Sequence, residues 1–377
     1  MKLLIGGSPC TRWSIAQTKN RETEASGIGW ELFLNYRIAR DKYKPDYFLY
    51  ENNKSMSPAI RTQITAELGV EPVLINSALV SAQNRQRLYW VGKRNPDGTY
   101  SQVPVEQPED RGILLRDILE TGIAWNEKSY CIAATEYKGS NPQQTLTKHR
   151  RTMAAEPLVT TKNRKSFAIT ANYVHIQDYP NDYSAHTIEK SVKPLVAEPV
   201  QVGAMPYSIA FDDDVRPIKT VNADGKEITI YEVNDGQITI KGKQYPIKLV
   251  DGYYIIRKLT VRECMRLQTV PEEYVFPVSN SQAYKMLGNG WTVDVIAHIM
   301  SHFEGLTTEP VEVLSMYDGM SCGHIALDKL GVQPWLLRYY ATEIDKYAIQ
   351  TTQHNFPETV QLGDAFQVRN DDWRVKE

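Results

Sequence analysis

A cysteine on a stiffened loop is the first residue in this sequence whose setting suggests chemistry. Residues 2–5 are a short apolar run that predicts a β-strand, and the loop Gly-Gly-Ser-Pro-Cys follows at once and ends at Cys10. Pro9 fixes its own backbone angle φ and so restricts where the thiol can lie. An isolated cysteine is more often an inert apolar residue, but a position at the carboxyl end of a strand favours a nucleophile.

Three charged residues follow at the ends of the next predicted strands. Residues 47–50 predict a buried strand that ends at Glu51, which leaves its carboxylate at the same sheet edge as the cysteine; a simple helix cap and turn is the alternative interpretation. Arg85 and Arg87 stand at alternate positions, which puts them on one face of a strand. They are either two fixed cations for a polar ligand or the solvated face of an edge strand.

A glycine-containing turn near the end of the chain predicts a nucleoside site. The segment YDGMSCG (residues 317–323) follows a predicted strand and opens a predicted helix, whose N–H groups can face a ligand. Glu343 ends the next strand, 20 residues after Gly323, where a carboxylate can accept hydrogen bonds from ribose hydroxyls. Asp364 ends the third strand, where it can meet an adenine amino group. The turn alone fits a tight strand-to-helix connection equally well, so the prediction depends on all three together.

The elements that position these residues predict an α/β fold. Residues 1–100 and 312–377 alternate strands with helices, which is typical of a mostly parallel sheet. The C-terminal half by itself would leave an open sheet edge. If residues 2–5 pair beside the C-terminal strands, one doubly wound, Rossmann-like sheet results and the two termini lie close together.

The middle of the chain has a different texture. Residues 128–258 are rich in Thr, Tyr, Asn, Pro and Lys with short β-like runs, and they predict a smaller β-rich domain. Within it, KSY and AEPLV (from 128 and 155) are echoed by KSF and AEPV (from 165 and 197), which indicates two similar hairpin units. We therefore divide the chain into a catalytic half, the β-rich domain, a helical return and a cofactor half, at residues 1–127, 128–258, 259–303 and 312–377.

Bulk composition excludes several classes of protein. Hydrophobic residues make up 42% and charged residues 23% of the 377 residues, which fits a folded globular chain. The net charge of −2 means that any nucleic-acid surface must be a local patch. The four cysteines have no CxxC spacing, and His298 with His302 lacks an obvious acidic partner, so we predict no metal site and a reduced, intracellular protein. No apolar run is long enough to predict a membrane span.

Six segments together resemble the motifs of the C5-cytosine DNA methyltransferases. They are GGSPCTRWS, ENN, QNRQR, RECMRLQTVP, GNGWTVDVI and YDGMSCG, which begin at residues 6, 51, 83, 262, 288 and 317. They are similar in turn to the family's Pro-Cys, Glu-Asn-Val, Gln-x-Arg-x-Arg and Arg-Glu-x-x-Arg-Leu-Gln motifs, its closing Gly-Asn segment and its cofactor turn. Two features depart from the family: Asn53 stands in place of valine, and the cofactor turn follows the other motifs, a circularly permuted order.

The resemblance implies a fold, a reaction and a site. The fold is a Rossmann-like methyltransferase sheet with residues 128–258 as target-recognition domain. The reaction is transfer of a methyl group from S-adenosylmethionine to C5 of cytosine in DNA, with the Cys10 thiolate adding to C6. The implied catalytic residues are Cys10, Glu51, Arg85 and Arg87. The implied cofactor-binding residues are Pro9, Asn289, Trp291, Tyr317, Asp318, Gly319, Cys322, Gly323, Glu343, Ile344, Asp345 and Asp364.

DNA must reach this site by base flipping, because C6 is inaccessible in a stacked duplex. Residues 11–30 predict either a mobile loop that closes over the flipped base or a plain surface connector. Residues 128–165 carry eight Lys or Arg and two acidic residues, a stretch that can contact phosphates. The DNA-binding residues that we predict are Arg12, Ser14, Lys19, Arg21, Lys148, Arg150 and Arg151.

The same resemblance sets the expected biological context and two alternatives. We expect a monomeric, cytoplasmic enzyme, bacterial or phage-encoded, that acts on double-stranded DNA, with a cognate restriction endonuclease of a restriction-modification system acting separately. The alternatives are an RNA cytosine C5-methyltransferase and a DNA-binding relative that has lost catalysis. The large variable domain argues against the first, and the presence of Cys10, Glu51 and Arg87 argues against the second.

Overall fold

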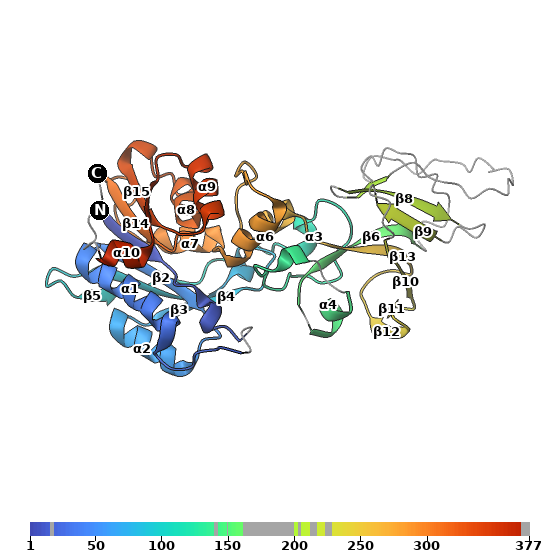
Figure 1. The fold of residues 1–377 in the computed structure, drawn as a ribbon, viewed down its shortest axis with the longest axis horizontal. Coiled ribbons are helices and arrows are strands. Elements are labelled where there is room, and N and C mark those ends of the chain that lie inside the picture. The colour runs from blue at the N-terminus through green and yellow to red at the C-terminus, as the bar shows by residue number, and fades with distance from the viewer. Residues whose placement is uncertain are drawn as a thin grey trace. The chain divides into compact units, whose positions relative to one another are not determined.

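The computed structural model describes most of the chain as two compact units. It describes residues 1–15, 19–138, 142–148, 150–160, 200–202, 205–211, 217–222 and 228–370. The first unit comprises Met1–Ile113, Ala133–Tyr137 and Met265–Glu377, and the second comprises Leu114–Ile132 and Lys138–Cys264. Both ends of the sequence therefore belong to one unit, whose elements are shown in blue and red in Figure 1.

An eight-stranded sheet forms the centre of the first unit. Its order is β16-β15-β14-β1-β2-β4-β3, and β5 pairs with β4. The pairs among β16, β15, β14, β1 and β2 are parallel, whereas β4 is antiparallel to β2, β3 and β5. The strands are β1 (Lys2–Gly6), β2 (Tyr47–Asn53), β3 (Pro72–Asn76), β4 (Gln86–Arg94), β5 (Tyr100–Gln102), β14 (Val311–Met316), β15 (Leu337–Thr342) and β16 (Val360–Gly363). The expected mostly parallel sheet is confirmed, with β4 as the strand that runs against the others.

The predicted pairing of the two ends of the sequence is confirmed by β1. It runs parallel to β14 on one side and to β2 on the other, so that Gly6 pairs with both Met316 and Tyr50. The carboxyl ends of these three strands therefore meet at one edge of the sheet, next to the loop that leads to Cys10.

Helices cover both faces of this sheet, as a doubly wound fold requires. One face packs Leu4, Phe48 and Tyr50 against α1 (Gly27–Tyr43), α2 (Pro58–Leu68) and α10 (Ala365–Asn370). The opposite face carries α7 (Val293–Met300), α8 (Cys322–Lys329) and α9 (Lys346–Asn355), and α8 approaches the sheet closely at Gly323, where a Cβ would lie 2.2 Å from Ile5 (Figure 1). Side chains alternate between the faces of a strand, which is why neighbouring strand residues serve different helices.

Local signals explain where several elements begin and end. The sequence predicts a helix over residues 59–68 that Gly69 ends, and Gly69 does close α2, with φ 75°. The helix begins one residue earlier, at Pro58 behind the Ser57 cap. The apolar run at residues 73–80 predicts one continuous strand, and this prediction is wrong in its second half. β3 ends at Asn76, whose side chain accepts the Ala78 N–H and starts the 3₁₀ turn η2 (Ser77–Leu79). The helix α10 was not predicted.

Helices lie within residues 259–303, as predicted for the helical return. It contains α5 (Val261–Leu267) and α6 (Asn280–Asn289). Thr260 begins α5 as predicted: its hydroxyl accepts the Glu263 N–H at 3.1 Å, and the Glu263 carboxylate accepts the Thr260 N–H at 2.8 Å. This reciprocal pair is a capping box.

The second unit is β-rich, as the texture of its sequence predicts. A five-stranded antiparallel sheet has the order β12-β11-β10-β13-β6, and β7, β8 and β9 form a second sheet. The strands are β6 (Met153–Thr160), β7 (Val200–Val202), β8 (Met205–Phe211), β9 (Pro217–Asn222), β10 (Ile230–Asn234), β11 (Gln237–Ile240), β12 (Lys243–Pro246) and β13 (Gly252–Lys258), with the short helices α3 (Leu115–Ile118) and α4 (Pro142–Lys148). The second copy of the predicted repeat lies outside the described residues, apart from Val200.

Two-residue hairpin turns and one ion cluster organise this unit. Gly236 and Gly242 follow residues that also have positive φ, which closes the β10–β11 and β11–β12 hairpins. Arg257 lies between the carboxylates of Glu156 and Glu263, at 2.6 and 2.8 Å, and this arrangement holds β13 to β6 and to α5. No helix in the described part of the chain combines the length and hydropathy that a membrane span requires.

Candidate active site

The loop after β1 lies at the junction of the two halves of the sheet. Ser8 is buried and Pro9 is exposed, and Cys10 opens the 3₁₀ turn η1 (Cys10–Arg12). The side chain of Cys10 lies outside the described part of the structure. Its backbone leaves the strand that pairs with both β2 and β14, so the loop begins between Glu51 and the turn that follows Met316.

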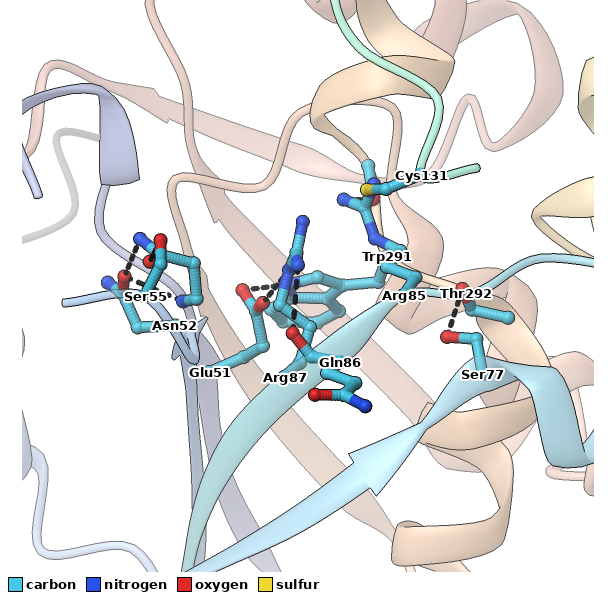
Figure 2. A network of polar contacts seen from close by, with 12 residues as sticks. Glu51, Asn52, Ser55, Ser77, Arg85, Gln86, Arg87, Cys131, Trp291 and Thr292 are labelled. Carbon is cyan, nitrogen blue, oxygen red and sulfur yellow. Dashed lines mark hydrogen bonds and ion pairs between the residues drawn. The ribbon is translucent and has the colours of Figure 1, made fainter. Parts of the chain in front are cut away.

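Glu51 is held from two sides in an arrangement that we call the carboxylate clamp (Glu51, Arg87 and Trp291). Arg87 Nε lies 3.1 Å from Glu51 Oε1, and the Trp291 indole Nε1 donates to Glu51 Oε2 at 3.0 Å (Figure 2). The antiparallel register opposes Arg87 to Asn53, which makes Arg87 the diagonal neighbour of Glu51 on one face. A Cβ on Gly7 would lie 2.9 Å from Glu51 Oε2, so only glycine lets the carboxylate pack against the cysteine loop.

Arg85 is not part of the carboxylate clamp. The expectation that the two arginines lie on one face of a strand is wrong for Arg85. It precedes β4 and is 4% exposed. Its guanidinium donates to the carbonyl of Gly290 at 2.8 Å and to that of Gly288 at 3.3 Å. The bend of the chain at Asn76 and η2 places Arg85 next to the turn that precedes Trp291, so these hydrogen bonds position the turn that carries the indole.

A buried polar cluster around Gln268 supports the same turn, and the sequence reasoning did not single it out. The Gln268 amide donates to the carbonyls of Leu287 and Gly290, and its oxygen accepts from Thr292 Oγ1 at 2.9 Å. The hydroxyl of Ser77 then donates to Thr292 at 2.8 Å, as Figure 2 shows. Gln268 does lie within the RECMRLQTVP segment, but only its contacts indicate what it supports.

The predicted nucleoside turn is formed by three residues with positive φ: Tyr317, Gly319 and Ser321, at 59°, 62° and 57°. Glu343 stabilises it, since one carboxylate oxygen accepts the Gly319 N–H at 2.8 Å and the other accepts the N–H groups of the two residues after it. The Glu343 carboxylate therefore lies at the turn where the sequence predicts a ribose.

The remaining cofactor candidates divide into exposed and internal groups. Ile344 is 75% exposed despite its apolar side chain, and Asp364 is exposed at the start of α10, where it accepts the Phe366 N–H. Asn289 is exposed at the end of α6. Asp345 is more constrained, because it caps α9 through the Tyr347 N–H and pairs with Lys285 at 2.6 Å.

Asp318 and Cys322 serve the interior of the turn. Asp318 accepts hydrogen bonds from Ser315, Ser321 and Tyr339, and burial raises its pKa to about 6. Cys322 is 3% exposed, and burial raises the pKa of its thiol to about 12, so it stays protonated and is a poor nucleophile. These contacts indicate that both residues shape the turn.

The predicted DNA-binding residues fall in both units. In the first, Lys19 is exposed, Arg12 and Ser14 are partly buried, and Arg21 donates to the carbonyl of Ser55 at 2.7 Å. In the second, Lys148 and Arg150 are exposed, and Arg151 has a φ of 57°. The positions of these residues do not by themselves indicate that they bind DNA.

The described residues contain no group of three or more His, Cys, Asp and Glu side chains that could hold a metal ion. His298 and His302 stack edge to face at 5.1 Å, and their ring nitrogens lie within hydrogen-bond distance of the carbonyls of Glu106 and His298. The pair therefore has backbone partners at His298 itself, on α7, and at Glu106, in the segment that follows β5.

The fold is a Rossmann-like, largely parallel α/β sheet in which the cysteine loop leaves the strand between β2 and β14. The profile of the C-5 cytosine-specific DNA methylase family matches residues 1–304, most of the chain, and the protein belongs to this family. Members of the family methylate C5 of cytosine in DNA and use S-adenosylmethionine as methyl donor. The sequence-based assignment of family, fold class and cofactor is confirmed, and the RNA-directed and inactive alternatives are not favoured.

Three curated relatives illustrate the similarity. The type II methyltransferase M.SsoII of Shigella sonnei is 52% identical over 307 residues, which cover 78% of this chain and 62% of that protein. M.HpaII of Haemophilus parainfluenzae is 26% identical, with 78% and 69% covered, and M1.ScrFI of Lactococcus lactis subsp. cremoris is 26% identical, with 78% and 60% covered. The chain thus spans between 60 and 69% of the length of these three relatives. Among solved structures, Dnmt2 methyltransferase of S. pombe matches 73% of this chain and 72% of its own, with 16% identity and a TM-score of 0.31.

Proposed function

We propose that this chain transfers a methyl group to C5 of a flipped cytosine in a specific double-stranded DNA sequence, through a covalent bond between Cys10 and C6. The observation that carries the proposal is the position of β1. Because it pairs with β2 and with β14, one loop borders both the carboxylate clamp and the Gly319 turn. Nucleophile, acid and methyl donor must meet at a single base, and the proposal brings them together at this edge of the sheet.

The residues of the Gly319 turn suit an adenosyl group. A Cβ built on Gly319 or Gly363 meets no atom within 4 Å, so space is open over both turns. Between them lie the Glu343 carboxylate, which can accept from ribose hydroxyls, and the exposed Ile344, which offers an apolar surface to adenine. Bound S-adenosylmethionine supplies an electrophilic methyl group at this edge.

In the proposed reaction Cys10 acts as a nucleophile and Glu51 as an acid. The thiolate electron pair forms a bond to C6, and the charge that develops on the ring is taken up at N3 by a hydrogen bond or proton from Glu51. C5 then forms its bond to the methyl carbon while the bond from that carbon to the sulfonium sulfur breaks, which leaves S-adenosylhomocysteine as product. The C5 proton leaves to a base, its electron pair re-forms the C5–C6 double bond as the C6–S bond breaks to release the thiolate, and any proton on N3 returns to Glu51. Arg87 and Trp291 each engage one Glu51 oxygen, which fixes the direction of the carboxylate before a base arrives.

We assign the two arginines different parts in this reaction. Arg87 touches Glu51 and can reach the substrate base at the same edge, as the family resemblance implies. Arg85 acts as a positioning residue through the carbonyls of Gly288 and Gly290.

We further propose that the β-rich unit recognises the DNA sequence and that residues 11–30 close over the flipped base. Lys148, Arg150 and Arg151 would contact phosphates there, and Arg12, Ser14, Lys19 and Arg21 would do so near the site. The names of the bacterial and phage relatives, which are type II or orphan methyltransferases, support an intracellular role. We propose that the protein acts as a monomer and that a cognate restriction endonuclease acts separately.

We also propose that the motif order is a circular permutation of the family's. We propose in addition that residues 1–127, 128–258, 259–303 and 312–377 are the functional divisions of the chain. The pairing of β1 with β14 supports the first proposal, because it lets motifs from both ends of the sequence share one sheet edge.

Trapping on modified DNA tests the proposed chemistry. Duplex oligonucleotides with 5-fluorocytosine cannot lose a proton from C5, so the enzyme should remain bound covalently after methyl transfer, when S-adenosylmethionine is present. The target site is first found by bisulfite sequencing of DNA from cells that express the protein. We expect a denaturation-resistant adduct with the wild type and none with Cys10→Ala, nor with a matched RNA duplex. Methylation that Cys10→Ala retains would contradict the proposal.

A further inference from the structure

A chain of buried polar side chains begins two residues before Cys10. Ser8 Oγ and Tyr50 OH lie 2.6 Å apart, and the Asn52 amide donates to the Ser8 carbonyl and to Tyr50 OH, both at 3.2 Å. The Asn53 amide donates to Asn52 Oδ1 at 3.1 Å, and Ser55 Oγ donates to Asn53 Oδ1 at 2.6 Å. We call these five residues the polar chain; it follows the carboxyl end of β2 beside Glu51, where Figure 2 shows Asn52 and Ser55.

The far end of the polar chain contacts the segment that follows Cys10. Ser55 Oγ accepts the Ile15 N–H at 3.4 Å, and the Ser55 carbonyl accepts from Arg21 at 2.7 Å. Trp13, which precedes both contacts, is fully buried in the core, and its indole N–H donates to Glu22 at 3.2 Å. The polar chain therefore contacts the backbone on both sides of the cysteine.

Burial gives these hydrogen bonds their importance. Ser8, Tyr50, Asn52 and Asn53 are each at most 5% exposed. A buried polar atom that loses its hydrogen-bond partner cannot bond to water instead. Each hydrogen bond of the polar chain therefore depends on the one next to it. Burial also raises the pKa of Tyr50 well above its usual range, which keeps its hydroxyl neutral and able to both donate and accept.

Asn53 is the residue at which this chain departs from the Glu-Asn-Val pattern that its motif resembles. A valine could neither donate to Asn52 nor accept from Ser55, so the link between the two sides of the cysteine loop would be broken at its centre. We propose that Asn53, together with Ser55, is a positioning residue for the Cys10 segment. It fixes the backbone before and after the nucleophile to the strand that carries Glu51. This proposal rests on the proposed function.

Single-turnover methylation of duplex DNA by four variants tests this role. Asn53→Val and Ser55→Ala remove the two ends of one hydrogen bond, Ser55→Thr keeps the hydroxyl, and the double variant Asn53→Val/Ser55→Ala completes a cycle. We expect about a tenfold loss of single-turnover rate in each of the first two variants and no further loss in the double variant. The KM for DNA and for S-adenosylmethionine should stay within about twofold of the wild type, and Ser55→Thr should keep most of the rate.

Thr65→Val serves as the matched control, because it removes a hydroxyl that accepts from the Trp90 indole at 2.9 Å, away from the cysteine loop. If Asn53→Val and Thr65→Val lower the rate equally, or if Asn53→Val leaves it within about twofold, the inference is wrong. Additive losses in the double variant would also overturn it. An inactive wild type would instead contradict the proposed function, so the two failures are distinguishable.

Discussion

The carboxyl edge of the sheet has two parts that are built from contacts of very different range: the part around Glu51, which we call the catalytic edge, and the part around Gly319, which we call the cofactor edge. At the catalytic edge Glu51 bonds Trp291, 240 residues away, and Arg85 bonds Gly290, 205 residues away. At the cofactor edge Asp364 bonds a backbone N–H two residues on, and Glu343 bonds its two following neighbours and Gly319, 24 residues away.

This difference shows which part of the site depends on local sequence and which part needs several distant elements of the fold. A turn and a cap need only their own segment, so the hydrogen bonds of Glu343 and Asp364 depend mainly on local sequence. Longer contacts, from Asp345 to Lys285 and from Tyr317 to the Leu32 carbonyl, then hold the cofactor edge to the rest of its unit. The carboxylate clamp needs β2, β4 and the turn before α7 in place together. Substitutions at the two edges should therefore affect different steps, and four predictions follow that comparison from the largest expected effect to the smallest.

Glu51→Gln should give the largest effect, because it removes the acid while leaving an amide of the same shape. We expect the methylation rate to fall by about a thousandfold, within the usual range for an acid–base residue. Binding of S-adenosylmethionine, measured by calorimetry, should be unchanged. A comparable loss of cofactor affinity would show that the two edges are not separate.

Glu343→Ala should produce the reverse pattern. Removing its carboxylate loosens the Gly319 turn and removes the ribose acceptor, so the affinity for S-adenosylmethionine should fall by about 10- to 100-fold. At saturating cofactor the single-turnover rate should recover. Glu304→Gln, which changes a surface carboxylate paired with Lys93, is the control and should bind like the wild type. A rate that stays low at saturation would contradict this prediction.

Trp291→Phe sharpens the comparison, since sequence reasoning assigned this residue to the cofactor pocket and the structure gives it a bond to Glu51. Loss of one N–H donor to a carboxylate should lower the methylation rate by about tenfold, with cofactor affinity within about twofold of the wild type. Trp90→Phe removes an equivalent indole hydrogen bond, to Thr65, and should leave the rate unchanged. Weakened cofactor binding in Trp291→Phe with an intact rate would restore the original assignment.

Asp318→Asn should have the smallest effect, and one that depends on pH. Burial raises the pKa of Asp318 to about 6 from an ordinary value of 3.8, so between these values the folded protein holds a proton that the unfolded chain has released. The carboxyl therefore stabilises the fold at the acid end of this window and loses that contribution as the pH rises through about 6. The melting temperature of the wild type minus that of the variant should decrease between about pH 4 and pH 7. A difference that does not change with pH would count against a raised pKa.

The sequence predicted most of the architecture because its signals were local. Alternating strands and helices indicated the doubly wound sheet, Gly69 ended α2, and Thr260 capped α5. The prediction failed where a side chain redirected the backbone: Asn76 ended β3 early, so Arg85 left the strand on which its alternation with Arg87 had placed it. The strand propensity of a few residues does not reveal such a turn, because the turn is caused by one side-chain amide, that of Asn76. Its consequence appears only at Arg85, nine residues later.

What the sequence by itself determined is the inventory and its order: a cysteine loop after one strand, a carboxylate after the next, a nucleoside turn after a third, and motifs specific enough to indicate the family. Only the tertiary structure decided the partners of these groups, such as the indole of Trp291 on Glu51, the guanidinium of Arg85 under Gly290, and Asn53 between Asn52 and Ser55. The physical reason is that hydrogen bonds act over about 3 Å and are directional, so long-range partners are fixed by strand register and packing.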